Sequence, residues 1–216
     1  MKYKVLLIMT ESTAEHLENL REIRSMMEKS SRFISLSGLS GVIAGIYALA
    51  GAAIAFWYLD MNLYGRIPKS YFHHQYEFNL FFFTDAIIVL VLAISTGIIF
   101  TTRQAKKNGQ KIWDATSRRL LINTAIPLIA GGGYCLALVY YQIVGLIAPA
   151  TLIFYGLALI NGSKYTLEDI RYLGYCEIAL GLIATMFIGY GLFFWAFGFG
   201  ILHILYGTIM YFKYEK

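Results

Sequence analysis

Charged residues are scarce in this sequence, and their scarcity decides the class of protein. Asp, Glu, Lys and Arg together make up 14% of the 216 residues, whereas soluble domains carry about 25%. Hydrophobic residues account for 58%, and the mean hydropathy is +0.58. This composition excludes an ordinary soluble domain and indicates an integral membrane protein.

Cysteine and histidine are also rare, which narrows the chemistry that the chain can support. The two cysteines, Cys135 and Cys176, lie inside apolar runs, where a thiol behaves as a small buried hydrophobe and not as part of a disulfide framework. Within the apolar runs His203 is the single histidine, which excludes a haem held by two axial histidines and any His or Cys pair at metal-ligand spacing. We therefore expect no metal site and no bound cofactor.

Catalytic motifs are lacking as well. The sequence contains neither a Gly-x-Ser-x-Gly elbow nor a phosphate-binding glycine loop, which are the patterns of many hydrolases and nucleotide-binding enzymes. No recognisable catalytic set supports an enzyme, so the sequence favours a protein without catalytic activity.

Six apolar segments are long enough to cross a bilayer. A membrane-spanning helix needs about 20 mainly apolar residues, because it rises 1.5 Å per residue through a hydrocarbon core of roughly 30 Å. The sequence predicts an all-α, polytopic transmembrane bundle over residues 34–216, preceded by a cytoplasmic segment, residues 1–33. The predicted spans are 34–59, 79–102, 120–141, 143–161, 173–189 and 191–212, and the last four form two tight helical hairpins.

Lysine and arginine are distributed unequally between the two ends of these spans. The side that holds both termini carries 16 of the 18 basic residues, and the other side carries only Arg66 and Lys69. Because basic residues are held on the cytoplasmic side, both termini are predicted to be cytoplasmic. The basic loop 103–119 is then expected to face anionic lipid headgroups, which accounts for its charge without a nucleic-acid partner.

The N-terminal segment 1–33 is the only sizeable soluble part. Its acids and bases are mixed, and no small-residue cleavage site follows a short apolar core, so we expect no removable signal peptide. Ser12 and Glu15 form a capping-box pattern that predicts the start of an amphipathic helix. The apolar stripe of this helix consists of Leu20, Ile23, Met27 and Ile34. It could pack on the membrane helices, dock a cytoplasmic partner or form a homo-oligomer.

Small residues in the first predicted span indicate close helix packing. Ser37, Gly41 and Gly45 repeat every four residues, and small residues let helix backbones approach in a membrane, where lipid tails provide no hydrophobic drive. We expect this face to contact a helix of the same chain or of a second copy. In the third span, glycines 131–133 after Pro127 predict a kink or a close contact, and the alternative is a broken helix that lines a cavity.

Ionisable and strongly polar side chains inside the spans are costly, and they are therefore the first candidates for function. Asp85 lies on the second span, Glu177 on the fifth and His203 on the sixth, with Asn123 near the cytoplasmic end of the third. If the last hairpin turns at Tyr190, Glu177 and His203 are each 13 residues from the turn. Antiparallel helices would place both at one depth, about 20 Å from the turn.

The depth match leaves three alternatives open for Glu177 and His203. A carboxylate and an imidazole can share a proton and form a hydrogen-bonded structural pair, which lowers the cost of keeping both out of water. They can also form a functional pair that binds a proton or a ligand. In the third alternative the two side chains face different ways and make no contact.

The stretch "HHQYEFNLFFFTD", residues 73–85, begins the second span on the extracytoplasmic side. At 100° per residue, Glu77 falls about 60° and Asp85 about 20° from His74, so all three share one helix face. In one interpretation His74 and Glu77 are ordinary interfacial residues and only Asp85 is buried. In the other, the face is a polar vestibule that binds a cation or passes protons towards Glu177 and His203.

Two stretches carry a resemblance to a known family: "NGSKYTLEDIRYLGYCEIALGL", residues 161–182, and "SRFISLSGLSGVIAGIYALAGAA", residues 31–53. They resemble an uncharacterised family of small bacterial integral membrane proteins with six spans. The resemblance implies a multi-pass protein of the bacterial inner (plasma) membrane, and it assigns no activity and no functional residue. Thr166 and Asp169 form a capping-box pattern that predicts the cytoplasmic start of the fifth helix. Its first turn is expected to be solvated or to dock a cytoplasmic partner.

Two classes of function remain. The first is a non-enzymatic membrane sensor or regulatory protein, whose cytoplasmic helix and basic loop report on a ligand or lipid held among the spans. The second is a small transporter or proton-linked permease that uses Asp85, Glu177 and His203. The spans show no internal repeat of the kind that many transporter folds carry, which favours the first class. The candidate ligand- or proton-binding residues are Asp85, Glu177, His203, Asn123, His74 and Glu77.

Overall fold

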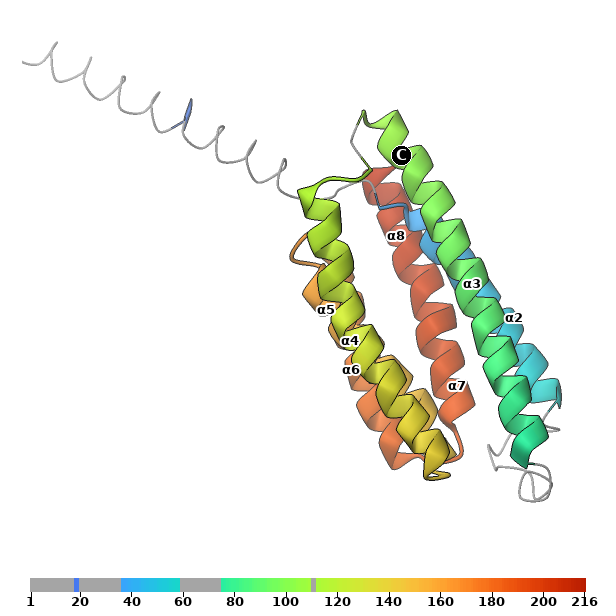
Figure 1. Ribbon diagram of the computed structural model, residues 1–216. Helices are drawn as coiled ribbons and strands as arrows, with labels where there is room; N and C mark the ends of the chain where they lie inside the picture. The colour runs from blue at the N-terminus through green and yellow to red at the C-terminus, as the bar shows by residue number, and fades with distance from the viewer. Residues whose placement is uncertain (1–17, 20–35, 59–74, 110–111) are drawn as a thin grey trace, which may run out of the picture.

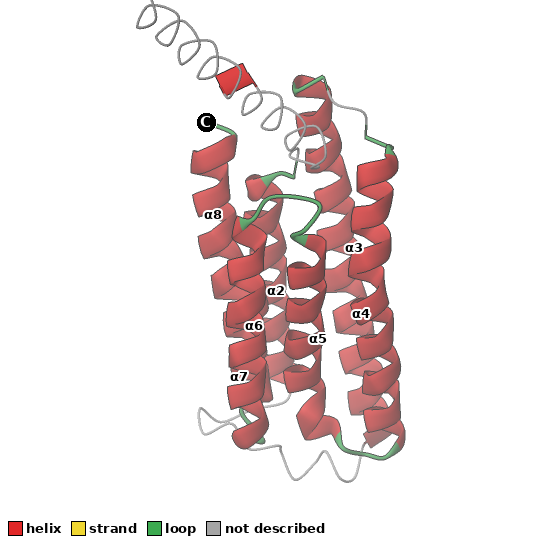
Figure 2. Ribbon diagram, turned by 90° about the vertical axis from the view of Figure 1, so that its left-hand side faces the viewer, coloured by secondary structure: helices red, strands yellow, loops and turns green. Residues whose placement is uncertain are grey.

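The computed structural model describes residues 18–19, 36–58, 75–109 and 112–216, and within them all regular structure is helical. The helices stand side by side and are connected at the two ends of the bundle (Figures 1 and 2). The amphipathic helix predicted in the N-terminal segment, the residue His74 and the loop with Arg66 lie outside the described residues. The elements are α2 (Gly38–Tyr58), α3 (Gln75–Lys107), α4 (Ala115–Tyr140), η2 (Val144–Leu146), α5 (Ile147–Gly162), α6 (Asp169–Met186), α7 (Gly191–Trp195), η3 (Ala196–Leu202) and α8 (His203–Tyr214).

Five helical stretches of the described chain are long and apolar enough to cross a membrane. They are Gly38–Tyr58, Tyr76–Lys107, Ala115–Tyr140, Val144–Gly162 and Gly191–Tyr214. The predicted all-helical membrane fold is confirmed, with five candidate spans where the sequence predicts six. The helix that falls short is α6, because its 18 residues include three charged ones, Asp169, Arg171 and Glu177.

Glycines join α2 to α8, as the repeat in the first span predicts. A Cβ atom at Gly38 would lie 2.5 Å from the carbonyl oxygen of Gly207, and one at Gly207 would lie 2.6 Å from the amide nitrogen of Val42. The two backbones are therefore in direct contact, and the glycine face of α2 packs on a helix of the same chain. Such contact maximises van der Waals attraction between helices in a membrane.

A second glycine contact joins α5 to α6. A Cβ at Gly156 would lie 2.6 Å from the carbonyl oxygen of Gly174, and one at Gly174 would lie 2.8 Å from the carbonyl oxygen of Gly156. The bundle thus contains two closely packed helix pairs, α2 with α8 and α5 with α6. The outer helices α3 and α4 pack on α2 and on α5 respectively.

The helix α4 runs unbroken through Pro127, so the predicted broken helix is not found there. Gly131 makes the predicted close contact, because a Cβ at this position would lie 2.5 Å from Cβ of Phe154 on α5. Gly132 and Gly133 meet nothing within 4 Å and face outward. Only the first of the three glycines is therefore needed for packing.

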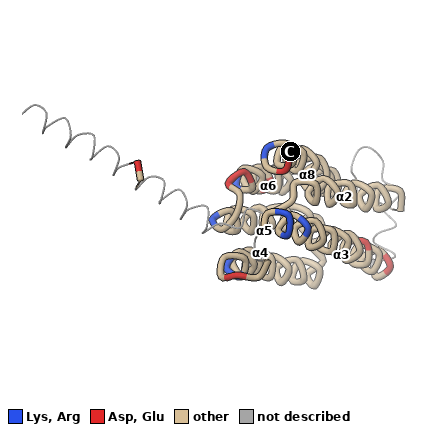
Figure 3. Tube along the Cα trace, turned by 90° about the horizontal axis from the view of Figure 1, so that it is seen from above, with Lys and Arg blue, Asp and Glu red and all other residues tan. Residues whose placement is uncertain are grey.

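All lysines and arginines of the described residues lie at one end of the bundle. This end carries the connections from α3 to α4 and from α5 to α6, together with the end of α8 (Figure 3). The opposite end carries the turns from α4 to η2 and from α6 to α7. In the second of these turns Gly189 has a φ of 104°, a conformation that glycine adopts without strain.

Asp114 caps the first turn of α4 at the basic end. Its Oδ1 accepts a hydrogen bond of 2.7 Å from the Ser117 amide, and the Ser117 hydroxyl accepts one of 2.9 Å from the Asp114 amide. This is a reciprocal capping box. The bond from the Ser117 amide holds the pKa of Asp114 below its ordinary value of 3.8, because it favours the charged carboxylate.

We expect Asp114→Ala to destabilise the protein by about 1 kcal/mol at pH 7, as the loss of an N-cap does. The pKa of Asp114 is lower in the folded protein than in the unfolded chain. The charged carboxylate therefore stabilises the folded protein fully above about pH 4, and this stabilisation is lost as the pH falls through the folded-state pKa. The free energies of unfolding of the parent and of Asp114→Ala, measured in mild detergent, should therefore differ less at pH 3 than at pH 7. Asp114→Asn, which keeps a cap acceptor, should remain close to the parent at pH 7, and an undiminished difference at pH 3 would contradict this role of the charge.

Candidate functional site

A row of polar side chains lies between the two glycine-packed pairs, where α6 faces α8. The two helices meet there mainly through side chains, whereas α5 and α6, like α2 and α8, meet backbone to backbone. We call this row the α6–α8 seam. Its contacts are Glu177 with His203, Cys176 with Tyr206 and Asp169 with Lys213.

Glu177 is the most enclosed member of the seam. Its side chain is 0% exposed, and its Oε1 lies 3.5 Å from Nδ1 of His203. Neither carboxyl oxygen has a hydrogen-bond partner among the described residues, so the contact with the imidazole is within ion-pair distance without being a hydrogen bond. A buried carboxylate without a donor is costly. Glu177 is therefore tolerated better as the neutral carboxylic acid than as the carboxylate.

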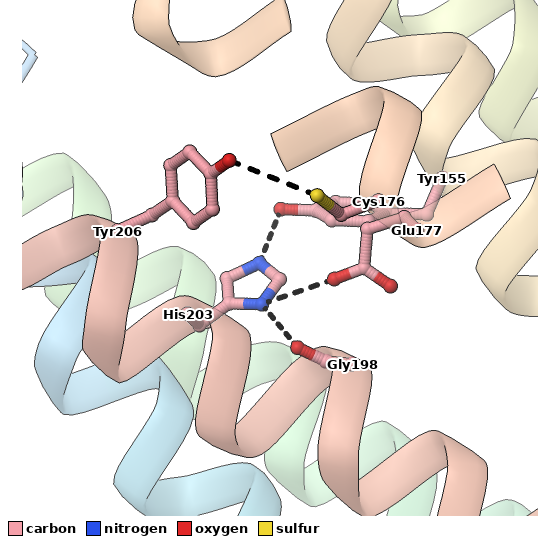
Figure 4. Close-up of polar contacts among 6 residues, drawn as sticks. All are labelled: Tyr155, Cys176, Glu177, Gly198, His203 and Tyr206. Atoms are coloured by element: carbon pink, nitrogen blue, oxygen red, sulfur yellow. Dashed lines mark hydrogen bonds and ion pairs between the residues drawn. The ribbon is translucent and has the colours of Figure 1, made fainter. Parts of the chain in front are cut away.

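His203, 8% exposed, uses both ring nitrogens on other partners (Figure 4). Nδ1 contacts the carbonyl oxygen of Gly198 at 3.0 Å, and Nε2 contacts the hydroxyl of Tyr155 at 2.8 Å. Because a carbonyl oxygen can only accept, Nδ1 carries a proton, and in the neutral ring Nε2 accepts from the Tyr155 hydroxyl. The mutually satisfied pair is thus not the observed arrangement, since His203 is satisfied by Tyr155 and Gly198 while Glu177 is not.

The backbone before His203 is a π-helical turn, η3. Such turns are rare and occur frequently at functional sites. Gly198 within it supplies the carbonyl that binds His203, and a Cβ at this glycine would lie 2.5 Å from Oε2 of Glu177. Gly198 therefore makes room for the carboxyl group and orients the imidazole at the same time.

Aromatic rings cover the side of the cluster that faces the turn from α6 to α7. The ring of Phe199 lies 4.9 Å from that of Tyr155 and 5.7 Å from that of His203, measured between centroids. Trp195 packs on Phe199 at 5.1 Å. Trp195, the outer member of this aromatic stack, also lines a cavity.

The seam ends in an ion pair at the basic end of the bundle. Nζ of Lys213 donates to Asp169 at 2.8 Å, and the hydroxyl of Tyr214 donates to the same carboxylate at 2.6 Å. The predicted capping box is wrong, because α6 begins at Asp169 after Glu168 and without a side-chain cap. Asp169, expected in a solvated first turn, instead ties the start of α6 to the end of α8.

Asp85 lies apart from the seam, on the wall of a cavity of about 280 Å³ between α2, α3, α4, α5 and α7. Gly51 of α2 adjoins its carboxyl group, because a Cβ there would lie 3.2 Å from one oxygen and 3.4 Å from the other. Trp195 lines the same cavity. The cavity is therefore linked to the seam through Trp195, which packs on Phe199 beside His203.

The remaining candidates are not brought to either site. Asn123 donates to the carbonyl oxygen of Arg119 in its own helix, and its own carbonyl oxygen accepts from Asn161, so it joins α4 to α5 near the basic end. Glu77 is exposed in the first turn of α3. No group of three metal-ligating side chains occurs in the described part of the chain.

Comparisons with protein-family models, with curated proteins and with solved structures found no match. Function must therefore be argued from the seam and the cavity.

Three members of the site carry no signal in the sequence. Tyr155 is one of 17 tyrosines and lies in a span without ionisable residues, and Gly198 resembles any packing glycine. Trp195 occurs in an aromatic run near a predicted turn. Only the equal spacing of Glu177 and His203 from the hairpin turn gave a signal, and it predicted a common depth without predicting contact.

Proposed function

We propose that this chain is a six-span, non-enzymatic membrane sensor or regulatory protein that responds to the gain and loss of a proton at Glu177. The observation that carries the proposal is the buried Glu177 carboxyl group, which has no hydrogen-bond donor and lies between two separately packed helix pairs. With a proton the carboxyl group is neutral and is tolerated in the seam. Without it, an unpaired negative charge would face the interior.

The membrane topology of the proposal includes α6 as the sixth span. α6 lies against α5 and runs from the basic end of the bundle to the opposite end. With α6 added to the five candidate spans, the chain crosses the membrane six times, and an even number of crossings leaves both termini on the same side. The basic residues at one end support cytoplasmic termini through the positive-inside rule. We place the protein in the bacterial inner membrane, on the strength of the resemblance alone.

The seam offers a route from Glu177 to the cytoplasmic surface. Glu177 lies about 12 Å along α6 from Asp169 by the helical rise, and Asp169 is held by Lys213 of α8. A change in how α6 meets α8 at Glu177 would alter the geometry of this ion pair. The two glycine-packed pairs would move as units, because backbone contacts do not deform continuously.

The groups that face Glu177 from neighbouring elements are few. His203 approaches from α8 and Tyr155 from α5, and the Cys176–Tyr206 contact lies beside them. No lysine or arginine of the described chain lies next to Glu177. A pH response near the Glu177 carboxyl group at neutral or mildly acidic pH therefore involves Glu177 or His203, and substitutions can separate the two.

Trp195 provides an intrinsic probe, since it packs on the aromatic stack beside His203. With Trp57 and Trp113, which are 82% and 68% exposed, changed to phenylalanine, its fluorescence in liposomes should show one pH-dependent transition. We expect Glu177→Gln to abolish this transition and Glu77→Gln, at an exposed carboxyl group, to leave it unchanged.

Two results would overturn the proposal. The transition would belong to the imidazole if it persisted in Glu177→Gln and disappeared in His203→Gln. It would belong to the cavity if Asp85→Asn removed it, because Asp85 and Trp195 line the same space.

A proton-linked permease is the second candidate, favoured by the proximity of the cavity to the seam. It requires the aromatic stack to open, so that Asp85 and Glu177 share one path. Proton flux into liposomes, abolished by Glu177→Gln and by Asp85→Asn, would support it. Absence of flux in the parent protein would remove it.

A further inference from the structure

The cavity beside Asp85 is almost wholly apolar. Its volume of about 280 Å³ is near the lower end of the range of ligand pockets, about 300–1,000 Å³. Within the described chain, Asp85 is its only charged lining residue. Side chains that form its walls include Ala52, Ala55, Phe82, Ala148, Thr151 and Trp195. The cavity is therefore suited to a small molecule with a compact apolar body.

Asp85 makes no hydrogen bond or ion pair with any described residue. Its carboxyl group lies against Gly51, where the missing side chain leaves room for it. Among the described residues no lysine, arginine or histidine lines the cavity. A ligand of this cavity would have to supply the opposite charge, because a carboxylate in apolar surroundings is costly unless it is paired.

Aromatic rings line the cavity together with this carboxyl group. Phe82 contributes from α3 and Trp195 from α7, so rings from two elements accompany one acidic side chain. The face of an aromatic ring, above all of tryptophan, attracts organic cations, and quaternary ammonium groups are recognised in this way. A carboxylate in a cavity with aromatic walls therefore favours the binding of organic cations over that of neutral or anionic molecules.

The two outer helices α3 and α4 both contribute residues to the cavity wall. α3 packs on α2 and α4 packs on α5, whereas these two outer helices form no extensive contact with each other in the described structure. A ligand with an apolar body could enter between them without separating either glycine-packed pair.

We propose that the cavity binds a small organic monocation, a quaternary ammonium or a protonated amine, with its charge at Asp85 and its apolar body between Phe82 and Trp195. Neutral apolar molecules would leave the carboxyl group unpaired, and anionic ones would be repelled. A metal ion would find one carboxyl group, and no group of three His, Cys, Asp or Glu side chains occurs in the described part of the chain. This site does not depend on Glu177, so it is independent of the proposed proton response.

Benzyltrimethylammonium and its uncharged carbon isostere, neopentylbenzene, test the proposal on the full chain in nanodiscs. Quenching or a spectral shift of Trp195, in the variant with Trp57 and Trp113 changed to phenylalanine, reports binding. We expect saturable binding of the cation with at least tenfold preference over the isostere. Asp85→Asn should weaken binding of the cation at least tenfold and leave the isostere unaffected, and Glu77→Gln should bind as the parent does.

A second variant covers the case that Asp85→Asn disturbs folding. Ala148→Leu should fill the cavity and abolish binding of both compounds, with the carboxyl group unchanged. Equal binding of cation and isostere by the parent protein would overturn the proposal and identify a site for neutral apolar molecules. Absence of saturable binding, or cation binding that survives Ala148→Leu, would overturn it too.

Discussion

Replacing Gly207 with leucine is expected to destabilise the bundle by about 3 kcal/mol, at the upper end of the range for overpacked cores. A Cβ at this position would lie 2.6 Å from the amide nitrogen of Val42 and 2.7 Å from the carbonyl oxygen of Gly38. Both atoms belong to the backbone of α2, so no side-chain rotation can relieve the overlap. The α2–α8 pair would have to separate, and unfolding in a titration from mild detergent into dodecyl sulfate should occur earlier.

Gly132→Leu is the matched control, because it adds the same side chain to a helix glycine that meets nothing within 4 Å. This variant should be as stable as the parent or slightly more stable, since glycine in a helix costs roughly 0.5–1 kcal/mol relative to alanine. Equal destabilisation by both substitutions would mean that leucine disturbs the helices themselves. The close contact between α2 and α8 would then not be the cause.

Glycine faces could be predicted because their signal is local. The four-residue repeat of Gly41 and Gly45 places both on one side of a helix whatever the partner is. The partner itself, α8, could not be predicted, since any other helix with small residues would satisfy the same face. The same reasoning explains glycines 131–133, among which the sequence could not distinguish the packed one from the two exposed ones.

The α6–α8 seam shows where prediction from the sequence ends. Equal spacing from a hairpin turn sets the depth of Glu177 and His203, but the rotation of each helix about its axis decides whether they meet. The π-helical turn η3 changes that rotation just before His203, and no sequence pattern indicates it. The pairing of Asp169 with Lys213 is equally hidden, because it joins helix ends that are 44 residues apart.

The face of the second predicted span that carries Asp85 packs on another helix. Its helix face meets α2, where Phe81 stacks on Tyr58 with ring centroids 3.9 Å apart and Asp85 adjoins Gly51. Glu77 is exposed at the helix start, and His74 lies outside the described residues, so the predicted vestibule stays a prediction. Asp85 lines a cavity, which Trp195 of the aromatic stack also lines.

Replacing His203 with phenylalanine should destabilise the protein by about 2–4 kcal/mol, since buried polar groups that lose their partners cost about 1–3 kcal/mol each. The groups concerned are the Tyr155 hydroxyl and the Gly198 carbonyl. Part of this cost should depend on Glu177, which would then face an apolar ring. We therefore expect Glu177→Gln to reduce the cost of His203→Phe by about 1 kcal/mol in a double-mutant cycle, measured by unfolding in mild detergent.

The cycle separates direct contact from mere proximity. Additive effects of the two substitutions would show that the 3.5 Å approach of Nδ1 to Oε1 has no energetic consequence, and Glu177 could not then act through His203. A control cycle combines Glu177→Gln with Asn123→Ala, because Asn123 bonds to Arg119 and Asn161 near the basic end. The effects of these distant substitutions should add within about 0.5 kcal/mol. A coupling also seen in the control cycle would reflect a general loss of packing and not the seam.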